Sequence, residues 1–179
     1  MFFFVLFWIL LVAGFAINAL LDRHPQRRTK PRLVELALLW VMVFGGVWGL
    51  IGVFSHIGPY SAQTAASIGY APSMFQWEVG WGDLTLCVLG IGSFWFRDRW
   101  LTAAVVAVTI SFGGDAIGHI MQWSQGNLAP DNTWATPSDI LQPLLGILLL
   151  IAYRRGFGRL PELPAHGVVG PQPMDASRQ

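Results

Sequence analysis

Residues 111–139, SFGGDAIGHIMQWSQGNLAPDNTWATPSD, place an acid and an imidazole inside an apolar segment that then becomes polar. Asp115 and His119 are four residues apart, so on a helix their side chains lie on one face, about one turn from each other. Turn-forming residues between 124 and 137 predict an outer loop after this helix. Ser138 is the expected N-cap of the next helix. The stretch therefore predicts two membrane helices joined by a polar loop, with ionisable groups on the first helix.

The composition of the whole chain is that of a membrane protein. Hydrophobic residues make up 54% of the 179 residues, charged residues only 12%, and the mean hydropathy is +0.51. Roughly twenty apolar residues in a helix cross the hydrocarbon layer of a bilayer. The predicted fold class is an all-α membrane protein, a bundle of five transmembrane helices at about 2–21, 33–57, 75–96, 100–123 and 138–153.

Basic residues cluster in 22–32, 97–99 and 154–159, and five spans bring all three clusters to the same side. Because Lys and Arg in short loops stay in the cytoplasm, we expect the N-terminus outside and the C-terminus inside a bacterial inner membrane. Glu35, at the inner end of the second span, is expected to meet the basic loop or the lipid headgroups. The segment 60–73 is too polar to span and is expected outside, as a surface or re-entrant segment.

Other features limit the domain organisation and the classes of function. The bundle is expected to end near residue 157, and the proline-rich residues 158–179 are expected to form a disordered cytoplasmic tail. A net charge of +1 gives no indication of nucleic-acid binding. Cys87 is the only cysteine, which excludes an internal disulfide and a thiolate metal cluster. No repeat relates two halves of the chain, as it would in an inverted-repeat transporter.

Glycines at helical spacing predict close contacts between helices. Gly45 and Gly49 in the second span, together with Gly46 and Gly52, let another helix backbone approach, and Gly114 and Gly118 do the same beside the polar pair. Besides the lipid bilayer, the expected partners are therefore a partner membrane protein or a second copy of this chain, docked on these glycine faces.

Ionisable residues from several spans fall at similar depths in the outer half of the membrane. Counted from the outer ends of their spans, His119 matches Glu78, and Asp115 matches Asp83. Asp139 and Gln142 come from the outer end of the fifth span, and His56 from that of the second. We therefore expect an outward-facing polar pocket. The candidate ligand-binding residues are Glu78, Asp83, Asp115, His119, Gln122, Asn127 and Asp139.

Three interpretations of this cluster remain open. In the first, the polar groups are structural and form hydrogen-bonded contacts between helices in an accessory subunit of a larger membrane complex. In the second, they form a site for a small ligand, a proton or an ion. Finally, the residues His56, His119, Asp115 and Glu78 offer nitrogen and oxygen ligands to a divalent metal such as zinc, iron or manganese, as in a metal-dependent membrane enzyme.

Four segments also carry a resemblance. WEVGWGDL (77–84), GDAIGHI (114–120), GNLAPDN (126–132) and SDILQP (138–143) resemble an uncharacterised family of small multi-pass prokaryotic membrane proteins. The similarity covers the third to fifth spans. The resemblance implies a helical inner-membrane protein and assigns no reaction, so whether this chain is an enzyme is left undecided.

Overall fold

The structure, a computed structural model, describes residues 2–157, which form helices joined by short loops, without a β-strand in this range. The expected tail at 158–179 lies outside the described residues. Two π-helical turns, η1 and η2, extend α-helices, and η1 joins α2 to α3 in one continuous helix. The elements are α1 (Phe2–Leu21), α2 (Lys30–Leu39), η1 (Trp40–Phe44), α3 (Gly45–Ile57), α4 (Ser61–Ser67), α5 (Phe75–Gly92), α6 (Arg99–Ser124), α7 (Pro130–Ala152) and η2 (Tyr153–Phe157).

Four helical stretches are long and apolar enough to cross a membrane, which indicates an integral membrane protein. They are Phe2–Leu21, Lys30–Ile57, Arg99–Ser124 and Pro130–Gly156. The expected third span, 75–96, corresponds to α5, which ends at Gly92 and is not among the four. Its 18 residues include Gln76, Glu78 and Asp83, and these polar side chains lower its hydropathy. The count of five spans and the orientation of the chain remain predictions.

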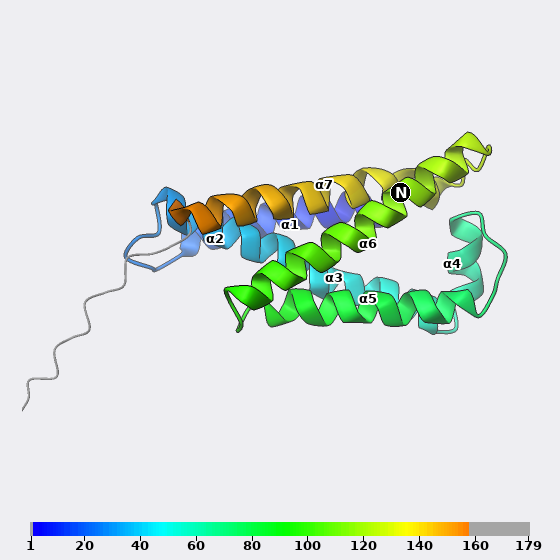
Figure 1. The fold of residues 1–179 in the computed structure, drawn as a ribbon, viewed down its shortest axis with the longest axis horizontal. Helices are drawn as coiled ribbons and strands as arrows, with labels where there is room; N and C mark the ends of the chain where they lie inside the picture. The colour runs from blue at the N-terminus through cyan, green and yellow to red at the C-terminus, as the bar shows by residue number, and fades with distance from the viewer. Residues whose placement is uncertain (1, 158–179) are drawn as a thin grey trace, which may run out of the picture.

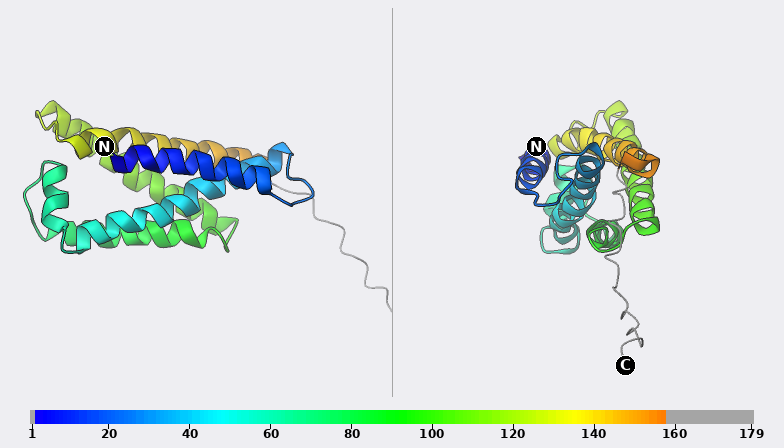
Figure 2. Two further views of the ribbon diagram at one scale, coloured as in Figure 1. Left: turned by 180° about the vertical axis from the view of Figure 1, so that it is seen from behind. Right: turned by 90° about the vertical axis from the view of Figure 1, so that its left-hand side faces the viewer.

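The helices form two layers that separate toward one end. Helices α3 and α5 run antiparallel along one side, α1 and α7 lie along the other, and α6 crosses diagonally to pack against α7 (Figures 1 and 2). The backbones of α3 and α5 touch, because a methyl group at Gly46 would lie 2.8 Å from the carbonyl oxygen of Cys87. The helix that approaches Gly46 therefore belongs to the same chain.

The apolar core lies in the half of the bundle nearer the loop between α1 and α2. Leu38, Met42, Leu101 and Val105 are almost fully buried there, at 0–2% exposure, and come from α2, η1 and α6. Phe7 of α1 stacks on Phe44 with a ring-centroid distance of 5.6 Å. The other half of the bundle, at the opposite end, contains the polar residues.

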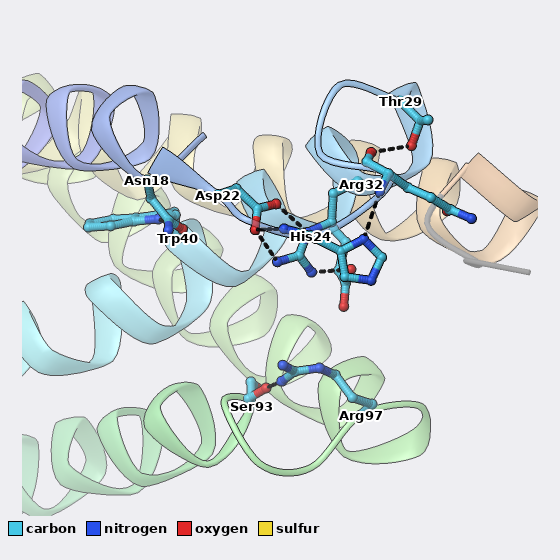
Figure 3. Close-up of polar contacts among 10 residues, drawn as sticks. Asn18, Asp22, His24, Thr29, Arg32, Trp40, Ser93 and Arg97 are labelled. Carbon is cyan, nitrogen blue, oxygen red and sulfur yellow. Dashed lines mark hydrogen bonds and ion pairs between the residues drawn. The ribbon is translucent and has the colours of Figure 1, made fainter. Parts of the chain in front are cut away.

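Charged residues hold the loop between α1 and α2 against the start of α2. Arg32 Nε donates to Asp22 Oδ2 at 2.7 Å, and Arg32 Nη1 donates to Glu35 Oε2 at 2.9 Å (Figure 3). The hydrogen bond from Arg32 holds the pKa of Asp22 below its ordinary value. The expectation that Glu35 meets the basic loop is confirmed.

The final long helix begins earlier than the sequence predicts. We expected a loop to residue 137 and an N-cap at Ser138, but α7 begins at Pro130, so these expectations are wrong. Proline fits the first turn of a helix because its φ is already helical and its missing N–H needs no partner there. Asn127 Oδ1 accepts the Ala129 N–H at 3.1 Å just before this turn. Ser138 lies inside α7, where its hydroxyl accepts a hydrogen bond from Trp8 Nε1 at 3.0 Å.

The segment 60–73 contains the short helix α4 and closes the separated end of the bundle. Thr64 Oγ1 donates to the Ser55 carbonyl at 3.1 Å, which fixes α4 to the end of α3. Asn127, between α6 and α7, donates through Nδ2 to the Ile68 carbonyl at 3.0 Å. Gly69 has a φ of +80°, and a methyl group there would collide with the Asn127 side chain. The segment therefore links the α3–α5 layer to the α6–α7 turn (Figure 1).

Candidate functional site

A cavity of about 800 Å³ lies between the α3–α5 pair and the α6–α7 pair, and the first turns of α1 form one of its walls. Aromatic side chains, among them Phe3, Phe7, Trp48 and Phe112, line its apolar part. Residues 68, 70, 71 and 73, which follow α4, contribute to the wall at the separated end. The polar residues of the lining are His56, Ser73, Gln76, Asp83, Asp115, His119, Ser138, Asp139 and Gln142, with Tyr70, Cys87 and the indole of Trp48 at its edges.

His119 lies between two side chains of α7. Its Nδ1 is 2.6 Å from Asn132 Oδ1, and its Nε2 is 3.4 Å from Asp139 Oδ2. Asn132 Nδ2 donates to the Asn127 carbonyl at 3.3 Å, which turns Oδ1 toward the imidazole. His119 Nδ1 therefore carries a proton, and Nε2 and the Asp139 carboxyl can share a second one. Asn132 and Asp139 are seven residues apart, two helical turns, and so present one face to α6.

His56 forms the equivalent contact on the other side of the cavity. Its Nδ1 is 2.6 Å from Oε1 of Gln76, a side chain of α5 that is 4% exposed. Asp83 lies within electrostatic reach of both His56 and Asp115. Each imidazole is thus held by an amide oxygen from a neighbouring helix, and each lines the same cavity.

Two carboxylates and one amide lining the cavity make no hydrogen bond with another described residue. Asp83 and Asp115 also form no ion pair among these residues, although their charges act on each other, on Asp139 and on the imidazoles of His56 and His119. Gln142 is 7% exposed and likewise makes no hydrogen bond within residues 2–157. The indole N–H of Trp48 is buried, again with no partner in the described chain. Hydrogen-bonding capacity is therefore left over inside the cavity.

Comparison with known proteins gives a family and no activity. The sequence profile of DUF6790, a family of unknown function, matches residues 1–159. The chain belongs to the DUF6790 family. The match confirms the expectation of an uncharacterised family and extends it over the first two helices, beyond the segments in which the resemblance was seen. No curated protein and no solved structure matches significantly.

The cavity of this DUF6790 chain brings together only some of the candidate residues. Asp83, Asp115, His119 and Asp139 line it, together with His56. Glu78 does not: its side chain is exposed on α5, because five residues separate it from Asp83 and turn it about 140° away around the helix. Gln122 and Asn127 lie outside the lining and bond each other, with Asn127 Nδ2 donating to Gln122 Oε1 at 3.3 Å.

The donor set expected for a divalent metal is not assembled. Within residues 2–157, no group of three or more His, Cys, Asp and Glu side chains is placed to hold a metal ion. Nδ1 of His56 and of His119 already faces an amide oxygen, and Glu78 lies outside the cavity. The described residues therefore do not fit the expected metal centre.

Sequence reasoning missed two amide residues that position the imidazoles. Gln76 is the second residue of the expected third span, and no sequence pattern links it to His56. Asn132 was interpreted as a turn former. Its spacing of seven from Asp139 would have revealed a shared helical face, but only if α7 had been predicted to begin at Pro130.

Proposed function

We propose that this DUF6790 protein is an integral membrane protein that binds a small ligand, a proton or an ion in the cavity beside Asp83 and Asp115. The observation that carries the proposal is the leftover hydrogen-bonding capacity of Asp83, Asp115 and Gln142 in a cavity of about 800 Å³. Ionisable groups at membrane depth are costly unless they are paired or wet, which favours a site occupied by a ligand or by water. Cavities of this size, largely apolar with a few convergent polar groups, are typical of small-molecule sites.

The polar end of the cavity lies away from the basic loop. The ionisable and amide side chains of the lining come from the end of α3, the first half of α5, the second half of α6 and the first half and middle of α7. The basic loop follows the end of α1, at the opposite end of the bundle (Figure 2). If Lys and Arg mark the cytoplasmic side, the cavity opens outward from a bacterial inner membrane.

Accessibility of the cavity from outside tests this proposal. In a Cys87→Ala background, Asp115→Cys should react with a membrane-impermeant maleimide added to intact spheroplasts. The matched control is Leu148→Cys, an exposed apolar position on α7 that we expect to face lipid. Reaction of the cysteine at 115 only after the membrane is opened, or no faster than the control, would contradict an outward-facing cavity.

The structural role is the second candidate, and one observation favours it. Each imidazole forms a hydrogen bond to another helix: His119 bonds a side chain of α7, and His56 bonds a side chain of α5. Such interhelical hydrogen bonds help to hold membrane helix bundles together. For an accessory subunit, the docking surface would have to lie elsewhere than Gly45, Gly46 and Gly49, which contact α5 and α7 of their own chain. The discriminating result is a His119 variant that loses stability and retains every ligand-dependent property.

A further inference from the structure

We propose that the ligand of this cavity is a lipophilic amine, with its cationic nitrogen between Asp83 and Asp115 and its apolar body against the aromatic lining. This inference rests on the proposed ligand-binding function and names the class of ligand. Three features of the cavity support it: the sign of the charge in the lining, the leftover acceptors, and the aromatic walls.

The charge of the lining favours a cation. Three carboxylates line the cavity, and no lysine or arginine is among the described lining residues. Asp139 faces His119, but Asp83 and Asp115 have no ion-pair partner within residues 2–157. An anionic ligand would add a like charge to this cluster, whereas an ammonium group would neutralise part of it and donate hydrogen bonds to both carboxylates.

Gln142 independently indicates a hydrogen-bonding ligand. The side chain is 7% exposed, lines the cavity and makes no hydrogen bond with another described residue. Its amide extends over the bare backbone of α3, because a methyl group at Gly45 would lie 2.5 Å from Gln142 Nε2. A ligand N–H that donates to its carbonyl oxygen would supply the hydrogen bond that no described residue makes to this amide.

The rest of the cavity suits an apolar body. Phe3, Phe7, Trp48 and Phe112 line it, and the rings of Phe3 and Trp48 lie 5.1 Å apart between centroids. Aromatic faces favour both an apolar chain and a nearby ammonium group. His56 and His119 also face this space, so a protonated imidazole would compete with the amine for the carboxylates.

Three ligands of similar shape can show whether the cavity prefers a cationic, a neutral or an anionic head group. The probes are 4-phenylbutylamine, 4-phenylbutanol and 4-phenylbutanoate, which differ only in the head group. Binding to the purified full chain in detergent micelles would be followed by calorimetry and by tryptophan fluorescence. We expect the amine to bind at least about tenfold more tightly than the alcohol, and the carboxylate to bind more weakly than both.

Neutral variants locate the head group. Asp83→Asn and Asp115→Asn should each weaken binding of the amine by about tenfold or more and leave binding of the alcohol unchanged. Glu78→Gln is the matched control, since it removes an exposed carboxylate from the same helix as Asp83, outside the cavity. Thermal unfolding of each variant shows whether it is folded.

Equal binding of amine and alcohol, preferred binding of the carboxylate, or an equal loss with Glu78→Gln would overturn the amine proposal. Binding of the alcohol or the carboxylate, sensitive to cavity substitutions, would leave the proposed binding function standing. Absence of binding by all three probes would also overturn the amine proposal. The proposed function itself falls only if the cysteine at 115 is, in addition, unreactive from outside.

Discussion

Two clusters of acidic residues in this protein differ in whether a basic side chain pairs with their carboxylates. At the loop between α1 and α2, Arg32 satisfies both Asp22 and Glu35 at 2.7 and 2.9 Å. In the cavity, Asp83 and Asp115 lie near each other without a hydrogen bond or ion pair to any described residue. The first cluster contains a paired counter-charge, whereas the carboxylates of Asp83 and Asp115 have only the imidazoles of His56 and His119 within electrostatic reach and bond neither of them.

This difference distinguishes a cluster with a structural role from a candidate binding site. A polar cluster that only joins helices is expected to pair its own groups, because an unpaired buried charge destabilises the fold. The loop cluster meets this expectation, and so does His119 with Asn132 and Asp139. Asp83, Asp115 and Gln142 do not meet it.

The largest expected effect comes from removing His119. His119→Ala leaves Asn132 and Asp139 without their imidazole partner in a largely buried position, so the free energy of unfolding should fall by about 2 kcal/mol. Thermal unfolding in detergent measures the change, and Met121→Ala, at a 55% exposed position on the same helix, is the control. Equal stability of the two variants would show that this contact does not hold α6 to α7.

A smaller loss is expected at the loop cluster. Arg32→Gln removes the counter-charge of Asp22 and Glu35, and we expect a loss of about 1 kcal/mol, since this pair lies at the edge of the bundle. Arg28→Gln changes the net charge equally at an exposed position and should have almost no effect. If both variants unfold alike, the loop cluster is not a paired structural unit.

The pH dependence of stability tests whether Asp22 in the loop cluster is paired with Arg32. The hydrogen bond from Arg32 lowers the pKa of Asp22 below 3.8, so ionised Asp22 stabilises the fold at pH values above this figure. The contribution disappears as the pH falls through the lowered pKa of the folded state. Unfolding measured from pH 6 to pH 3 should therefore show a steeper loss in the natural chain than in Asp22→Asn. Parallel curves would contradict the lowered pKa.

The smallest effect on stability is expected at the unpaired carboxylates. Asp115→Asn removes a charge that has no ion-pair partner among the described residues, so the free energy of unfolding should change by less than about 0.5 kcal/mol or rise slightly. Asp22→Asn, which removes a paired charge, should be clearly less stable than Asp115→Asn in the same assay. The opposite order would mean that Asp115 is structural.

The long helices could be predicted from the sequence because hydropathy and length dominate their formation. Phe2–Leu21 is found where it was expected, and the basic loop after it contains the predicted contact with Glu35. The start of α7 could not be predicted in this way. Pro130 and Asn132 favour turns as much as the first turn of a helix, and the choice depends in part on the contact between Asn132 and His119, which forms only when α6 and α7 pack together.

Spacing along the helices could predict part of the cavity lining, but not the direction in which every side chain points. Asp83, Asp115, His119 and Asp139 reach one cavity because each lies on the inward face of its helix. Glu78 was expected beside them but is exposed outside the cavity, since the rotation of α5 is set by the contact between Gly46 and the backbone near Cys87. That contact depends on how two helices pack, and spacing within either helix does not determine it.

The same backbone contact constrains how the cavity can change width. A methyl group at Gly90 would lie 2.5 Å from the Met42 carbonyl, so on both sides of this crossing the main chains leave no gap for sliding. We therefore expect α3 and α5 to move as one rigid unit, pivoting where Gly46 and Gly90 bring the two main chains into contact. A bulky residue at either glycine would force these two helices apart. At the separated end of the bundle, the hydrogen bond from Asn127 to the Ile68 carbonyl ties the α6–α7 turn to the segment after α4 and so limits widening there.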